Sequence, residues 1–124
     1  MDKTLKVLLV DDSPLIINRL TRMLGDMQNI ERITTAGTLL EARFIMNRQE
    51  TNVMVLDINL PDGNGIQFLK WVQSHHPAVK VIMFSNMAGE FHRKAALAGG
   101  ATHFLDKSSE FFQLLAILDD TKSC

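Results

Sequence analysis

Residues 5–16 read LKVLLVDDSPLI, an apolar run that ends in two aspartates and is followed by a proline. The run from Leu5 to Val10 has the length and the aliphatic content of a buried β-strand. Pro14 suits the first turn of a helix, where a residue needs no backbone N–H, and apolar residues continue beyond it at helical spacing. This segment therefore predicts a strand, a short acidic loop and a helix, which is the beginning of a β-α-β unit.

The same alternation of short apolar runs and helical segments continues along the chain. Further strands are predicted at residues 30–36, 52–56, 79–84 and 103–105. The predicted helices are residues 14–27 with Gly25 inside, 39–46 capped by Thr38, a helix containing 66–72, residues 90–98, and a last helix capped by Ser108 or Ser109. Residues 60–65 contain a proline, an aspartate and two glycines, which predicts a turn. Five strands and five helices in strict alternation predict an α/β fold with a flavodoxin-like, doubly wound, five-stranded parallel sheet of order 2-1-3-4-5.

Length and composition restrict the class of protein. With 124 residues, 46% of them hydrophobic, the chain is expected to form one domain over residues 1–124, with no output domain. Thirteen basic and fourteen acidic residues give a net charge of -1, and no basic cluster indicates nucleic-acid binding. The single cysteine excludes an intrachain disulfide and favours the cytoplasm. No apolar run reaches the roughly 18 to 20 residues that cross a bilayer, so no membrane association is expected.

Five polar side chains leave the carboxyl ends of the predicted strands. Asp11 and Asp12 follow the first strand, Asp57 the third and Ser85 the fourth, and Lys107 lies two residues beyond the fifth. In this class of sheet, ligands bind outside the carboxyl ends of the strands, where the winding reverses. The sequence therefore predicts one site that gathers three carboxylates, a hydroxyl and an ammonium group.

Three crowded carboxylates need compensating positive charge. Two unit charges about 4 Å apart repel by roughly 4 kcal/mol at an effective dielectric constant near 20. Lys107 offsets one charge, and a hard divalent cation with oxygen ligands offsets the rest; Mg²⁺ suits a shallow site with few protein ligands. With Asp57 as nucleophile, the cation and Lys107 would hold the phosphoryl oxygens while the hydroxyl of Ser85 donates to another.

Four motifs occur in order along the chain, namely LLVDDS at 8–13, VLD at 55–57, LPDG at 60–63 and FLDK at 104–107. Together they resemble the receiver domain of bacterial two-component response regulators, over essentially the whole chain. The resemblance implies that Asp57 takes a phosphoryl group from a histidine kinase, a phosphotransfer protein or a small phosphodonor.

The resemblance also assigns roles to individual residues. Mg²⁺ would be coordinated by Asp11, Asp12, Asp57 and the backbone carbonyl of Asn59. The residue Ser85 would move toward the phosphoryl group and the ring of Phe104 would turn inward behind it. The surface of the fourth helix, fifth strand and fifth helix would repack to control a downstream protein or a linked output domain. Such a protein is expected not to be an enzyme, apart from catalysing its own phosphorylation and dephosphorylation.

Three positions depart from the pattern of the family. Asn86 is larger and more polar than the alanine or glycine common after the hydroxyl residue. Ser108 replaces the proline that often follows the lysine, which leaves the geometry of the Lys107–Ser108 peptide bond open. Phe104 lacks the hydroxyl of the tyrosine found in many relatives.

Other interpretations remain open at this point. Taken singly, Asp11 and Asp12 could cap a helix, Ser85 could be a loop residue, and Lys107 could be a solvated surface lysine. A small phosphatase that uses an aspartyl phosphate is a second hypothesis, although Asn59 cannot act as its general acid and base. A receiver-shaped interaction module that no longer uses phosphate is a third.

The last predicted helix carries more apolar residues than one buried face needs. We therefore expect a homodimer or partner interface through the fourth and fifth helices.

Overall fold

The structure is a computed structural model that describes residues 4–87 and 89–121. The strands of the main sheet are β1 (Leu5–Val10), β2 (Ile30–Ala36), β3 (Val53–Leu56), β6 (Lys80–Ser85) and β7 (His103–Asp106). The helices are α1 (Pro14–Leu24), α2 (Leu39–Met46), α3 (Gly65–His75), α4 (Glu90–Ala98) and α5 (Phe111–Asp120). All pairs in the sheet are parallel, in the order β2-β1-β3-β6-β7. The predicted order 2-1-3-4-5 is confirmed, because β6 and β7 are the fourth and fifth strands of this sheet.

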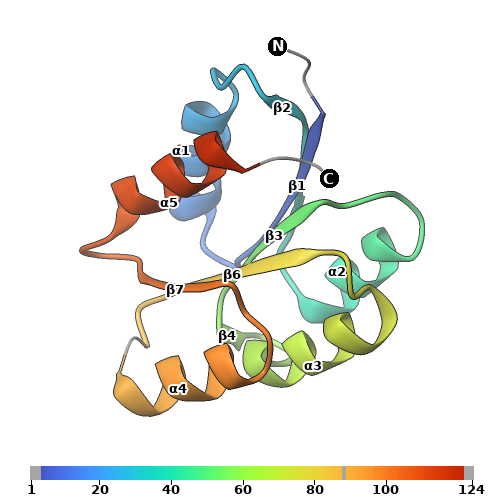
Figure 1. Cartoon of the computed structure of the whole chain (residues 1–124), viewed down its shortest axis with the longest axis vertical. Coiled ribbons are helices and arrows are strands. Elements are labelled where there is room, and N and C mark those ends of the chain that lie inside the picture. The colour runs from blue at the N-terminus through green and yellow to red at the C-terminus, as the bar shows by residue number, and fades with distance from the viewer. Residues whose placement is uncertain (1–3, 88, 122–124) are drawn as a thin grey trace.

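Helices cover both faces of the sheet (Figure 1). Helices α1 and α5 lie on one face, and α2, α3 and α4 lie on the other. Alternate residues of β1 enter the two cores: Leu8 and Val10 pack with residues of α2, α3 and α4, whereas Val7 and Leu9 pack with residues of α1 and α5. A strand buried on both faces is apolar at every position. None of the described helices is long and apolar enough to cross a bilayer.

The ends of α1 and α5 differ from the prediction. Helix α1 stops at Leu24, and Gly25 is its C-terminal cap rather than an internal residue, with its N–H bonded to the carbonyl of Thr21. Helix α5 begins after Glu110, not after a serine cap. Its entry is set by Asp106, whose carboxylate accepts hydrogen bonds from both the N–H and the hydroxyl of Ser108, and residues 107–109 form a turn.

The described peptide bonds include no cis bond, so the bond between Lys107 and Ser108 is trans.

The predicted turn at residues 60–65 overlaps a small antiparallel hairpin of β4 (Asn59–Leu60) and β5 (Gly63–Asn64). Between its strands, Asp62 reaches the beginning of α2 and accepts hydrogen bonds from the N–H groups of Leu39 and Leu40, at 2.8 and 3.0 Å. These bonds favour the ionised carboxylate and lower the pKa of Asp62. The hairpin thus connects the loop that follows β3 to the N-terminus of α2.

Candidate functional site

The predicted site residues converge at the carboxyl ends of the central strands. Asp11 follows β1, Asp57 follows β3, Ser85 ends β6 and Lys107 follows β7. A shallow cavity at this edge is lined by Asp12, Ser13, Asp57, Asn59, Ser85, Asn86, Met87 and Lys107. The parallel direction of the strands explains the convergence. Strands β1, β3, β6 and β7 pair in parallel, so their carboxyl ends lie along one edge of the sheet.

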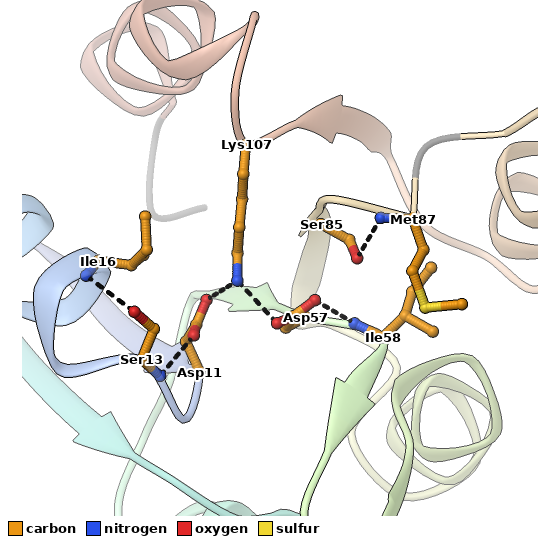
Figure 2. Close-up of polar contacts among 8 residues, drawn as sticks. All are labelled: Asp11, Ser13, Ile16, Asp57, Ile58, Ser85, Met87 and Lys107. Atoms are coloured by element: carbon orange, nitrogen blue, oxygen red, sulfur yellow. Dashed lines mark hydrogen bonds and ion pairs between the residues drawn. The ribbon is translucent and has the colours of Figure 1, made fainter.

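Lys107 lies between two buried carboxylates (Figure 2). Its Nζ is 2.5 Å from Oδ2 of Asp11 and 2.7 Å from Oδ2 of Asp57. All three side chains are at most 8% exposed. Burial by itself lowers the pKa of Lys107, but the hydrogen bonds and charges of the two aspartates outweigh it, and the net effect is a raised pKa. The lysine is therefore held as a cation inside the site.

The remaining oxygens of the two buried carboxylates are held by backbone N–H groups. Oδ1 of Asp11 accepts from the N–H of Ser13 at 2.9 Å, and Oδ1 of Asp57 accepts from the N–H of Ile58 at 2.7 Å. Ser13 also caps α1 with its hydroxyl, which accepts from the N–H of Ile16. Each carboxylate is thus fixed from two sides, which gives the site a preset geometry.

The surroundings of Asp11 disfavour its ionised form. Burial raises its pKa, and the hydrogen bonds from Lys107 and Ser13 offset this only in part. Asp57 contributes a smaller raising effect through its own charge. A further positive charge nearby would therefore stabilise the ionised form of Asp11.

The carboxylates also satisfy the requirements of a cation site. One oxygen from each of Asp11, Asp12 and Asp57 can be chosen so that all three lie within 4.8 Å of one another. Asp12 is exposed, and no hydrogen bond or ion pair joins its side chain to another described residue. Because a carboxylate oxygen has two lone pairs, the occupied oxygens can still accept a metal. Three hard oxygen donors at an open edge match the preference of Mg²⁺.

The two predicted switch residues are both buried, but only one faces the cavity. Ser85 is 1% exposed, and its Oγ accepts a hydrogen bond from the N–H of Met87 at 3.1 Å. In Figure 2 this hydroxyl is directed toward its own loop. Phe104 is 3% exposed and packs in the core beneath α2, α3 and α4. The ring is thus already in the inward position.

Sequence reasoning did not identify Ser13, Asp62 or Arg93 as residues of interest. A serine directly before Pro14 is a recognisable helix-cap signal, so the role of Ser13 in α1 could have been found. Its second contact, to Asp11, depends on the loop conformation. Asp62 binds the N-terminus of α2, more than twenty residues away, and Arg93 on α4 donates a hydrogen bond to the carbonyl of Phe104 on β7; no local pattern indicates either contact.

The comparison with sequence families decides the assignment. The family described as response regulator receiver domain matches residues 7–119. The chain belongs to this family. A solved response regulator receiver domain protein from Methanospirillum hungatei JF-1 superposes on this chain with a TM-score of 0.85 at 25% identity. The superposition covers 94% of this chain and 91% of the other. The predicted fold and family are therefore both confirmed.

Curated relatives are longer than this receiver domain. A protein-glutamate methylesterase/protein-glutamine glutaminase 2 of Vibrio vulnificus (strain YJ016) is 35% identical over 111 residues, which cover 88% of this chain and 32% of the relative. The DNA-binding transcriptional activator DevR/DosR of Mycobacterium tuberculosis is 28% identical over 115 residues, 93% of this chain and 53% of the relative. The chain thus spans about a third to a half of the length of these relatives.

These relatives correct one expectation. The prediction that the protein is not an enzyme is wrong as a general statement, because several curated relatives are named as methylesterases and glutaminases. The similarity covers only about a quarter to a third of each such relative. A receiver domain can therefore occur within an enzyme, and its own residues do not decide what accompanies it.

Proposed function

We propose that residues 1–124 form one receiver domain whose Asp57 accepts a phosphoryl group in a reaction that requires Mg²⁺. The observation that carries this proposal is the position of the Lys107 ammonium, which lies within 2.7 Å of both Asp11 and Asp57 at the carboxyl edge of the sheet. Bound Mg²⁺ would neutralise charge on the phosphoryl oxygens and on Asp11, Asp12 and Asp57, with the carbonyl of Asn59 as a further ligand.

Side chains of the protein itself carry out the other steps of the phosphoryl transfer. An oxygen of Asp57 attacks phosphorus, and the bond from phosphorus to the donor breaks. Lys107 moves its contact from the carboxylate toward a phosphoryl oxygen, where it neutralises charge. Ser85 exchanges its contact with the N–H of Met87 for a hydrogen bond to the phosphoryl group. The donor is a histidine kinase, a phosphotransfer protein or a small phosphodonor in the cytoplasm.

The output surface is formed by α4, β7 and α5. Phe91 and Leu97 on α4 are 79% and 45% exposed, and Phe112 on α5 is 66% exposed. Exposed apolar side chains on neighbouring elements are typical of contact surfaces. We assign this surface to a downstream protein, a linked output domain or a second copy of the chain, whose affinity changes when Ser85 and Phe104 respond to phosphorylation.

Intact-mass spectrometry tests the assignment of Asp57. After incubation with Mg²⁺ and acetyl phosphate, we expect the wild-type protein to gain the mass of one phosphoryl group and the Asp57→Asn variant to gain none, because an amide is not a nucleophile here. The Asp26→Asn variant changes an exposed carboxylate outside the site and should behave as wild type. Steady turnover of a phosphomonoester would instead favour the phosphatase hypothesis, and an unmodified wild type would favour a phosphate-independent interaction module.

Asp12 provides a separate test of the metal. Because its side chain is exposed and lacks described partners, Asp12→Asn should break no contact, and in EDTA it should leave the free energy of unfolding unchanged or raise it by relieving repulsion from Asp11 and Asp57. In the wild type, Mg²⁺ at about 100 times its Kd should raise that free energy by about 2.7 kcal/mol. The variant should lose most of this increase because one ligand oxygen of the cluster is gone. Urea unfolding with Mg²⁺ or EDTA measures both, and an equal Mg²⁺ effect in the two proteins would exclude Asp12 as a ligand.

A further inference from the structure

Arg93 on α4 contacts the backbone of the switch aromatic. Within the described residues, strand β7 is an edge strand that pairs with β6 alone, so some of its backbone groups have no strand partner there. One of these, the carbonyl of Phe104, accepts a hydrogen bond from Nη1 of Arg93 at 2.8 Å. A partly buried carbonyl without a partner is costly, and a guanidinium is a strong donor to it. Arg93 therefore joins α4 to β7 at the residue whose side chain is expected to move.

The same guanidinium also contacts the ring of Phe104. Cζ of Arg93 lies over the ring, 5.1 Å from its centroid, which is within the range of a cation–π interaction. Since phenylalanine has no hydroxyl, no hydrogen bond can hold this ring in either position. The stacking against Arg93 is therefore the one polar interaction available to the ring in the described structure.

A third contact ties Arg93 to the entry of α5. Nη2 of Arg93 lies 3.7 Å from Oε1 of Glu110, and the same oxygen accepts a hydrogen bond from the N–H of Asp106 at 2.9 Å. Asp106 directly precedes Lys107 and, through its carboxylate, holds the turn that follows. The three elements of the output surface thus meet at one side chain.

We propose that Arg93 is a positioning residue that holds the Phe104 ring in the core before a phosphoryl group reaches Asp57. The ring is 3% exposed while Ser85 is still bonded to the N–H of Met87, so the two switch residues are not locked to one another in this structure. Contacts present in only one state set the population of that state, and under this proposal the contact between Arg93 and the ring is made only while the ring is in the core. If the ring is already inward, phosphorylation can shift the equilibrium between its inward and outward positions by less. This regulatory consequence rests on the proposed function.

Fluorine NMR measures the position of the ring directly. The protein is labelled with 4-fluorophenylalanine, and the signal of Phe104 is assigned with the Phe104→Leu variant. Relaxation dispersion then reports a minor outward state on the microsecond to millisecond timescale. Without phosphodonor, Arg93→Ala should raise the outward population about three- to fivefold, the size expected for one lost cation–π contact. Arg93→Lys keeps the charge but not the planar guanidinium, so its outward population should lie between those of the wild type and Arg93→Ala.

Matched variants separate positioning from a general effect on α4. Lys94→Ala removes the neighbouring, exposed cation of the same helix and should leave the Phe104 signal as in wild type. Glu110→Gln weakens the anchor of Arg93 and should increase the outward population by a smaller factor. This variant serves as the test if Arg93→Ala does not fold. A Phe104 signal in Arg93→Ala and Glu110→Gln equal to that in Lys94→Ala would overturn the proposal.

The result is independent of whether Asp57 is phosphorylated. Failure of the proposed function would appear as an unmodified wild-type mass after treatment with acetyl phosphate, whereas failure of the Arg93 proposal would appear as an unchanged ring population. If both hold, the outward population in Arg93→Ala should fall back toward the wild-type value after phosphorylation, and its persistence would show that the ring is not coupled to Asp57.

Discussion

Replacing Lys107 with methionine is expected to lower the free energy of unfolding at about pH 7 by about 3 to 5 kcal/mol, the usual cost of removing one partner from a buried ion pair. Methionine keeps most of the length of the side chain, so the loss is mainly electrostatic. The carboxylates of Asp11 and Asp57, each at most 8% exposed, would then face one another without the ammonium that lies within 2.7 Å of both. The variant should also take up phosphate poorly, because the cation proposed to receive the phosphoryl oxygens is absent.

The pH dependence of this loss has a definite sign. The raised pKa of Lys107 means that its contribution to stability is complete below its ordinary pKa of 10.5 and is lost as pH rises through the raised value. In the variant, Asp11 loses the lowering contributed by Lys107, so its pKa, already raised by burial, rises further. Protonation of Asp11 then restores stability as pH falls. The deficit relative to wild type should therefore be larger near pH 7 than near pH 4.5.

Urea unfolding at the two pH values, with EDTA or Mg²⁺, measures this difference. Mg²⁺ should reduce the deficit near pH 7 because a divalent cation replaces part of the lost charge. The control is Lys70→Met, which removes an exposed lysine on α3 and should change the free energy of unfolding by less than about 0.5 kcal/mol. A loss from Lys107→Met that is the same at both pH values and unaffected by Mg²⁺ would mean that packing, not charge, explains the role of Lys107.

The fold and the core of the site could be predicted because both depend on simple periodic rules. Buried parallel strands are apolar at every position, so runs such as Leu5–Val10 are recognisable without tertiary information. The carboxyl ends of such strands meet at one edge, and this rule alone brought Asp11, Asp57, Ser85 and Lys107 together before any contact was known. What the sequence could not provide was the pairing itself, in which Lys107 binds two carboxylates at once.

The errors concern the ends of helices, where local effects of similar size compete. Gly25 was expected inside α1, but glycine costs a helix about 1 kcal/mol and ends it here. A serine was expected to cap α5, but Ser108 binds the carboxylate of Asp106 instead, and the N-terminal cap of the helix is Glu110. The alternative helix ends differ in free energy by about 1 kcal/mol, which is too little for the sequence pattern to decide between them.

Long-range polar contacts form the other group that sequence did not reveal. Asp62 was predicted only as part of a turn, yet it binds two N–H groups of α2, more than twenty residues away. Arg93 gave no signal because an arginine on an amphipathic helix is ordinarily a solvated residue. Its contacts with Phe104 exist only because α4 lies beside the edge strand β7. Both residues stabilise the arrangement of elements around the site.

The second large effect is expected from Gly65→Ala, at the first residue of α3. The N–H of Gly65 donates to the carbonyl of Ile58 at 2.6 Å, which draws the helix against the segment that carries Asp57, the proposed phosphorylation site. A Cβ at residue 65 would lie 1.9 Å from the carbonyl oxygen of Asp57 and 3.0 Å from Cα of Ile58. Both contacts are with backbone atoms, so no rotamer change can relieve them. Either α3 or the backbone of Asp57 must move.

We therefore expect Gly65→Ala to lower the free energy of unfolding by about 3 kcal/mol, the upper range for overpacking. If the protein still folds, its rate of phosphorylation by acetyl phosphate should fall by about tenfold or more, because a displacement of about 1 Å at a reacting group has effects of this size. Urea unfolding and intact-mass time courses measure the two effects separately.

Gly37→Ala is the matched control for this substitution, since a Cβ at residue 37 meets nothing within 4 Å. It should be neutral or slightly stabilising, because alanine restricts the unfolded chain more than glycine does. If Gly65→Ala matched Gly37→Ala in both measurements, the backbone around Asp57 would have to be soft enough to yield without cost. The carboxylate would then owe its position to Lys107 and the N–H of Ile58 alone, and the close approach of α3 would have no part in placing it.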